Sequence, residues 1–134
     1  MLITRASEYA ILSLILLSKA DKPRDNDTLS RELSISKSFL AKILQALAKE
    51  EILKSFKGVN GGFVLAKEPK SISMLEIISC VEGKMPAVFD CSSSVDDCPS
   101  DRAEICSIWP FLNKLQGKID SFLAELTLAD ILED

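Results

Sequence analysis

The sequence contains no histidine, and this absence argues against several classes of protein at once. Histidine is the usual general base of Ser-His-Asp and Cys-His hydrolases and the commonest metal ligand in proteins. The sequence also has neither a nucleophile paired with another base nor a Gly-rich loop of the kind that binds phosphates. We therefore expect that this chain is not an enzyme.

Glycine and proline are also scarce, and the sequence has no hydrophobic run of membrane-spanning length. Five of each in 134 residues exclude collagen-like and linker-like chains, while 47% apolar and 27% charged residues are typical of one globular domain. The apolar stretch from Tyr9 to Leu17 is too short to cross a bilayer and predicts a buried helix. With no basic leader or cleavage site at its N-terminus, the sequence predicts a cytoplasmic protein that does not bind membranes.

The two halves of the chain carry opposite charge. Residues 1–70 contain 12 Lys and Arg against 8 Asp and Glu, a net charge of +4. Residues 71–134 contain 4 against 12, a net charge of −8. If the partner is a polyanion, we expect only the first half to approach it.

The first half has the pattern of a helix-turn-helix. We predict helices over residues 4–19, from a cap at Asn26 or Asp27 to Leu33, and over 37–50 with Ser36 as its N-cap. The third of these should bury the apolar stripe Phe39, Leu40, Ile43, Leu44 and Leu47. Its outer face should then present the polar residues Lys37, Ser38, Lys42, Gln45 and Lys49. This order of elements is typical of proteins that bind the major groove of DNA. We predict that Ser36, Lys37, Ser38 and Gln45 contact base edges and that Lys42, Lys57 and Asn60 contact phosphates.

A β-hairpin is predicted directly after these helices. Two alternating runs, 52–57 and 63–66, flank a turn rich in Gly and Asn. A hairpin in this place is the wing of a winged helix, and Lys57, Asn60, Gly61 and Gly62 would let its backbone approach phosphates. The alternative is an ordinary small helical domain with a surface hairpin.

The second half is predicted to hold two helices and a cysteine-containing loop. The fourth helix, 71–81, should turn Ile72, Leu75, Ile78 and Val81 inward and end at Gly83. A long helix beginning near Ser107, its predicted cap, follows the loop, and Thr127 caps a short terminal turn. Apolar residues recur along it at alternating spacings of three and four, namely Ile105, Ile108, Leu112, Leu115, Ile119, Phe122 and Leu126. Such a seam favours dimerisation, although it could also pack on the core of its own chain.

Three of the four cysteines, Cys91, Cys98 and Cys106, lie in the Ser- and Asp-rich loop. Structural zinc sites usually contain a cysteine pair two to four residues apart, and no such pair is present. The wide spacing suits an iron–sulfur cluster better, because its sulfides supply much of the iron coordination. Exposed thiols without a role, a thiol–disulfide switch and a zinc site are the alternatives. Cys80 fits the apolar pattern of its helix and is expected to be a small buried residue.

These features occur together in a known family. The residues that carry the resemblance are Thr4-Arg5-Ala6-Ser7-Glu8-Tyr9-Ala10, Leu33-Ser34-Ile35-Ser36, Leu40-Ala41-Lys42-Ile43-Leu44, Lys57-Gly58-Val59-Asn60-Gly61-Gly62-Phe63, Ile77-Ile78-Ser79-Cys80-Val81-Glu82-Gly83, the three spaced cysteines and Thr127-Leu128-Ala129-Asp130. The sequence thus resembles the Rrf-two (Rrf2) family of bacterial winged-helix transcriptional regulators over nearly its whole length.

The resemblance implies a homodimer that binds a pseudo-palindromic operator in double-stranded DNA. It also implies that Cys91, Cys98 and Cys106 hold an iron–sulfur cluster, 2Fe–2S rather than 4Fe–4S. In one branch of the family a histidine three residues after the last cysteine is the fourth ligand, but Trp109 stands there and cannot bind iron. In other branches a carboxylate near the start of the first helix of the partner subunit is used, which assigns Glu8 as the fourth ligand.

Together these observations predict a mainly α fold with one small hairpin. A winged helix-turn-helix over 1–83 is followed by a cysteine loop and dimerisation helix over 84–134, within one compact unit. The predicted function is that of a transcriptional repressor whose affinity for its operator depends on an iron–sulfur cluster. One alternative has the same fold but senses cysteine oxidation or a small molecule without a cluster. Another is an iron–sulfur carrier or electron-transfer protein.

Overall fold

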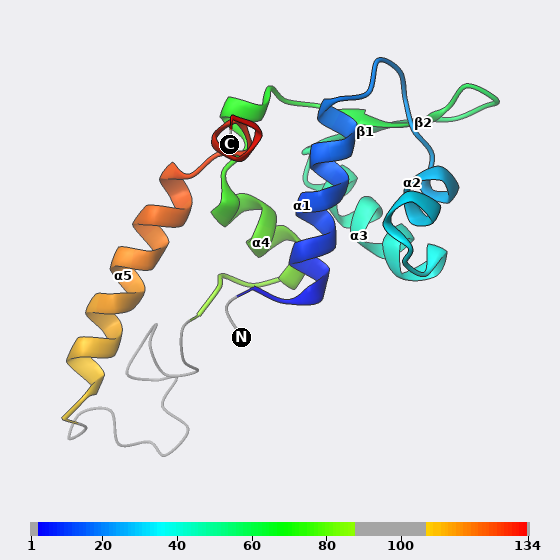
Figure 1. Cartoon of the computed structure of the whole chain (residues 1–134). Helices are drawn as coiled ribbons and strands as arrows, with labels where there is room; N and C mark the ends of the chain where they lie inside the picture. Colours follow the sequence, from blue (N-terminus) through cyan, green and yellow to red (C-terminus); the bar gives the residue numbers. More distant parts are fainter. Residues whose placement is uncertain (1–2, 88–106, 134) are drawn as a thin grey trace.

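A computed structural model describes residues 3–87 and 107–133 of the chain (Figure 1). Its elements in order are α1 (Arg5–Ser18), α2 (Asn26–Leu33), α3 (Lys37–Lys49), β1 (Leu53–Phe56), β2 (Gly62–Leu65), a 3-10 turn η1 (Pro69–Ser71), α4 (Met74–Glu82), α5 (Trp109–Glu125) and α6 (Leu128–Leu132). The predicted fold class, mainly α with one hairpin and a long C-terminal helix, is confirmed.

The core lies around α1, which contacts α2, α3, α4, α6 and the hairpin. Ala10 and Leu14 of this helix are fully buried, as expected for the apolar stretch that was too short for a membrane. Residues far apart in the sequence complete the core, because Leu123 and Leu128 join the same apolar cluster as the winged-helix residues. Burial of this apolar surface is the main stabilising contribution to the fold.

Helix starts follow the capping rules, with two departures from the predicted positions. Thr4, Ser36 and Ser73 each accept a hydrogen bond from a backbone N–H of the first turn. The cap of α2 is Asp25 rather than Asn26 or Asp27, because the Asp25 carboxylate accepts from the N–H of Thr28 at 2.8 Å. For α5 the predicted cap Ser107 is wrong. Ile108 holds that position and makes no side-chain capping bond.

The fourth helix is shorter than predicted. Residues 69–71 form η1, and α4 begins at Met74 after the Ser73 cap. Ile72 and Ile78 are buried as expected, but Leu75 and Val81 are only half-buried, and Met74 and Ile77 are buried in their place. Ile72 therefore lies before the helix rather than on it. Gly83 ends the helix as predicted.

The hairpin pairs Leu53 with Leu65 and Phe56 with Gly62 in antiparallel register. A third segment joins it, because Arg24 and Phe63 exchange two backbone hydrogen bonds of 3.2 and 2.8 Å. The start of β2, next to the turn, is therefore fixed to the connection between α1 and α2. In Figure 1 the turn between β1 and β2 extends away from the helices as a wing.

The long helix α5 packs beside α4 and extends past it (Figure 1). The predicted seam splits into two adjacent strips. Leu112 is buried and Ile119 packs against the core, whereas Ile108 and Phe122 are 54% and 63% exposed. Leu115 is half-buried, and Ile105 lies outside the described residues. The two strips are the two alternating rows of the seam, and only the row that contains Leu112 and Ile119 packs against the rest of the chain.

Candidate nucleic-acid interface

The helix-turn-helix is held together at its turn. Ser34 ends α2 in the left-handed conformation, with φ at +56°, and its backbone N–H donates to the last turn of α2. Across the turn, the side-chain amide of Asn26 donates to the carbonyl of Lys37 at 2.9 Å. This bond fixes the first turn of α3 against α2. Sequence reasoning missed it, because Asn26 was expected to cap its own helix.

The outer face of α3 carries the residues that the sequence predicted as DNA-binding. Ser36, Lys37, Ser38, Lys42 and Gln45 are all exposed. The helix contains no acidic residue, so its outer face is cationic along its whole length. Lys42 forms none of the ion pairs of the described residues and is therefore available to a phosphate.

Three of the predicted base readers have partners within the chain. The hydroxyl of Ser36 caps α3 by accepting from the N–H of Phe39 at 3.3 Å. It also lies 2.9 Å from the hydroxyl of Ser38. Lys37 is 3.6 Å from the carboxylate of Asp27, an exposed pair that contributes little to stability. These contacts organise the first turn of the helix that would enter the groove.

Phe39 is where the predicted core stripe is wrong. Its side chain is 38% exposed, whereas Leu40, Ile43, Leu44 and Leu47 are buried as predicted. Phe39 lies in the first turn of α3, at the side of the buried stripe rather than on it. Its ring meets that of Tyr9 edge to face, with centroids 5.9 Å apart and planes at 85°. In the sequence, the position of Phe39 directly after Ser36, Lys37 and Ser38 could have indicated that its side chain is exposed.

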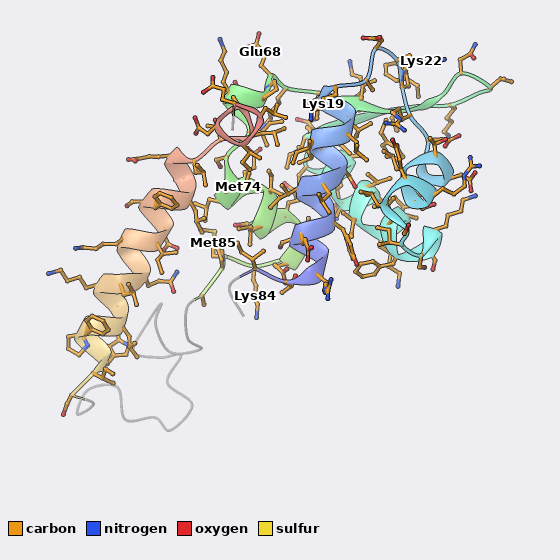
Figure 2. All side chains as sticks on the ribbon, viewed as in Figure 1. Lys19, Lys22, Glu68, Met74, Lys84 and Met85 are labelled. Carbon is orange, nitrogen blue, oxygen red and sulfur yellow. The ribbon has the colours of Figure 1, made fainter. Side chains whose placement is uncertain are left out.

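The wing presents Lys57 and Asn60, both exposed. Like Lys42, Lys57 takes part in none of the ion pairs among the described residues. A hollow of about 300 Å³ separates the wing turn from the start of α2, and Lys22, Thr28 and Asn60 are among its lining residues. Lys22 lies beside the wing in Figure 2, so the sequence prediction missed one cation near this surface.

Gly61 and Gly62 are required by contacts within the chain. A Cβ on Gly61 would lie 2.3 Å from the carbonyl oxygen of Phe56. A Cβ on Gly62 would lie 2.5 Å from the backbone of Arg24, and φ at +143° is itself unfavourable for other residues. Both glycines therefore have a structural role besides the predicted one in phosphate approach. These two glycines set the direction of the wing.

The predicted cluster ligands are only partly within the described residues. Cys91, Cys98 and Cys106 lie outside them. The Glu8 side chain is 52% exposed in the first turn of α1, 3.8 Å from the Arg5 guanidinium. Within residues 3–87 and 107–133, no group of three or more His, Cys, Asp or Glu side chains could hold a metal ion. An exposed Glu8 fits a ligand role, since its carboxylate can reach a group outside its own helix.

Cys80 is a structural cysteine, as the apolar pattern predicted, although it is half-buried rather than fully buried. Its thiol donates to the carbonyl of Ala46 at 3.2 Å and so links α4 to α3. Burial, together with the nearby carboxylates of Glu50 and Glu76, raises the pKa of Cys80 to about 11. At neutral pH it is a protonated thiol, which is a poor ligand and nucleophile.

The end of α4 is attached to the start of α1. The carboxylate of Glu82 accepts hydrogen bonds from the hydroxyls of Thr4 and the fully buried Ser7, the latter at 2.9 Å. An anion at the N-terminus of a helix is favoured by the helix dipole. The first turn of α1, which contains Glu8, is therefore joined by hydrogen bonds to the last turn of α4.

None of the described helices is both long and apolar enough to cross a membrane. The family model described as "Rrf2: Iron-dependent Transcriptional regulator" matches residues 3–134. The helix-turn-helix transcriptional regulator IscR of Yersinia enterocolitica is 26% identical over 136 residues, covering 100% of this chain and 80% of that protein.

Solved structures of similar proteins have the same fold as this chain. IscR of T. potens has a TM-score of 0.72 at 26% identity, covering 100% of this chain and 88% of that one. CymR, the global cysteine regulator of B. subtilis, has a TM-score of 0.74 at 24% identity, covering 98% and 95%. The matched relatives are named as transcriptional regulators, so the expectation that the chain is not an enzyme is confirmed. Because the family model spans nearly the whole sequence, this protein belongs to the Rrf2 family of transcriptional regulators.

Proposed function

We propose that this regulator is a homodimeric repressor that binds a pseudo-palindromic operator and responds to an iron–sulfur cluster. The observation that carries the DNA-binding part is the acid-free outer face of α3, on which Lys42 and Gln45 are exposed. In this proposal the first turn of α3 and Gln45 contact base edges in the major groove. Lys42, Lys57 and Asn60 position the protein on phosphates.

The outer strip of α5 supports the proposed homodimer. Ile108, Phe111 and Phe122 are 54%, 60% and 63% exposed, and half-buried Leu115 lies between them on the same strip. A row of large apolar side chains along one helix favours a second copy of that helix as its partner. Two-fold symmetry would place two α3 helices on the two half-sites of one operator.

For the sensing part, we assign Cys91, Cys98 and Cys106 as cluster ligands, with Glu8 contributed across the dimer. A bound cluster would supply a redox-sensitive and oxygen-sensitive group. The corner that joins Thr4, Ser7 and Glu82 supports a connection from the cysteine-containing segment to α1, against which α3 packs. A coupling of about 1–3 kcal/mol between cluster and operator corresponds to a roughly 5–150-fold change in DNA affinity.

One experiment tests this proposal as a whole. The wild type, Glu8→Ala and a Cys91/Cys98/Cys106 triple serine variant are purified without oxygen from iron-replete cells. Visible absorbance, inorganic sulfide and affinity for a duplex selected from a random library are then measured for each. We expect a coloured wild type, a colourless triple variant, and different DNA affinities for the two.

The alternatives predict different results. A colourless, iron-free wild type whose DNA affinity responds to a thiol oxidant or a small molecule would favour regulation without a cluster. A coloured wild type that retains no selected duplex would favour an iron–sulfur carrier or electron-transfer protein. DNA binding that is equal with and without the three thiols would remove the cluster from the regulatory mechanism.

A further inference from the structure

The first turn of α3 exposes one large apolar side chain among its polar neighbours. Phe39 is 38% exposed, and directly before it stand Ser36, Lys37 and Ser38. Its ring is not loose, because the edge-to-face contact with Tyr9 holds it against α1. An aromatic ring fixed at the entrance of a DNA-reading helix is a feature that needs a physical reason.

The polar neighbours of Phe39 are already engaged within the chain. The hydroxyls of Ser36 and Ser38 lie 2.9 Å apart, and Ser36 also caps the helix. Lys37 is near Asp27, and its carbonyl accepts from Asn26. The ring of Phe39 has no such polar function, so its exposed surface is an unfavourable contact with water that only another apolar group would relieve.

The major groove offers one apolar group on the edges of its base pairs, the 5-methyl group of thymine. We propose that Phe39 is a specificity residue that contacts a thymine methyl in the operator. This inference rests on the proposed entry of α3 into the major groove. It assigns to the half-site a thymine that is recognised through its methyl group rather than through a hydrogen bond.

The test removes the methyl group and the ring separately. A duplex selected from a random library by the wild type is remade with single thymines replaced by deoxyuridine, which lacks only the methyl. The ratio of affinities for the two duplexes is then measured for the wild type, Phe39→Leu and Phe39→Ala. Because each ratio compares two duplexes on one protein, a general loss of stability or of DNA affinity cancels.

We expect one thymine per half-site at which replacement by deoxyuridine lowers the affinity of the wild type about fourfold. This ratio corresponds to about 0.8 kcal/mol, the free energy of burying a methyl-sized group. For Phe39→Ala the ratio of the two affinities should fall toward one. For Phe39→Leu it should lie between the values of the wild type and of Phe39→Ala. Thymines outside the half-site are the internal control, with no loss in any variant.

Two results would separate failure of this inference from failure of the proposed function. Equal ratios for wild type and Phe39→Ala at every thymine, with selective binding retained, would overturn the role of Phe39 alone. If no duplex can be selected from the library, DNA binding by this surface is itself wrong. Measurement of the thermal midpoint of each variant shows that the compared proteins are folded.

Discussion

At the scale of single residues, charge and backbone contacts divide the wing into two kinds of position. Lys57 is exposed and makes no ion pair with the described residues, whereas Gly61 and Gly62 are in close contact with other parts of the backbone. Substitutions at the first kind should change DNA affinity, and substitutions at the second should change folding stability. Two predictions separate these effects.

Replacing Lys57 with alanine should weaken binding to all duplex sequences by a similar factor. The slope of log affinity against log salt concentration should decrease by about 0.9 for each phosphate that the variant no longer neutralises. Fluorescence anisotropy over a salt series measures both quantities. Lys84→Ala removes the same charge from an exposed position at the end of α4, far from the wing in Figure 2. If the two variants had equal salt slopes, Lys57 would not contact phosphate.

Replacing Gly62 with alanine should destabilise the protein by more than about 2 kcal/mol, because a Cβ meets the backbone of Arg24 and the residue has positive φ. The matched control is Gly117→Ala in α5, where a Cβ meets nothing within 4 Å. That variant should be more stable by about 0.5–1 kcal/mol, since alanine favours a helix. Urea unfolding followed by circular dichroism measures both, and a loss of stability in the control would contradict this account.

At the scale of elements, the ends of the helices carry the electrostatic features of the fold. Asp25 caps α2, and its hydrogen bonds with Thr28 hold the pKa of the carboxyl below its usual value. A lowered pKa in the folded state means that the ionised form is favoured by folding. The resulting contribution to stability is present above the ordinary pKa of 3.8 and is lost as the pH falls through the lowered value.

The variant Asp25→Asn isolates this charge, because asparagine keeps a side-chain oxygen that can cap the helix. Near neutral pH the wild type should have a larger free energy of unfolding than the variant, and this difference should not change with pH in that range. That difference should shrink once the pH falls below about 3.8 and disappear when the carboxyl is protonated in the folded protein. Urea unfolding at a series of pH values measures the difference, and a difference independent of pH would exclude a role for the Asp25 charge.

At the scale of the whole molecule, the outer strip of α5 is an apolar surface that the described residues leave uncovered. Phe111 and Phe122 are 60% and 63% exposed, although the inner strip of the same helix contains buried Leu112 and Leu123. Gln116 lies on the inner side and donates to the carbonyl of Pro86 at 2.8 Å. One side of α5 therefore packs within its own chain, and we predict that the other side packs against a second copy of the protein.

Replacing Phe122 with aspartate should halve the molar mass in solution, because a charge cannot be buried in an apolar interface without a partner. Analytical ultracentrifugation measures the mass, and affinity for the selected duplex should fall with it. Ser121→Asp adds the same charge at an adjacent exposed position off the strip and should leave the mass unchanged. A Phe122→Asp protein that kept the wild-type mass would place the dimer interface elsewhere.

The sequence was sufficient for those features that local chemistry decides. Ser36 caps α3, Gly83 ends α4, and Thr127 forms a capping box with Asp130, as their residue types and positions predicted. The hairpin followed from its alternating runs and its turn residues in the same way. Each of these depends on interactions within a few residues, which a linear pattern contains.

Only the tertiary structure decided which apolar residues remain in contact with water. Phe39 fits the buried stripe by type but lies beside it, and the regular seam of α5 divides because α4 covers one strip of that helix and not the other. The pairing of Arg24 with Phe63, which explains Gly62, joins segments far apart in the sequence. Burial is a property of neighbours that the chain brings together only on folding, and no pattern along the sequence contains those neighbours.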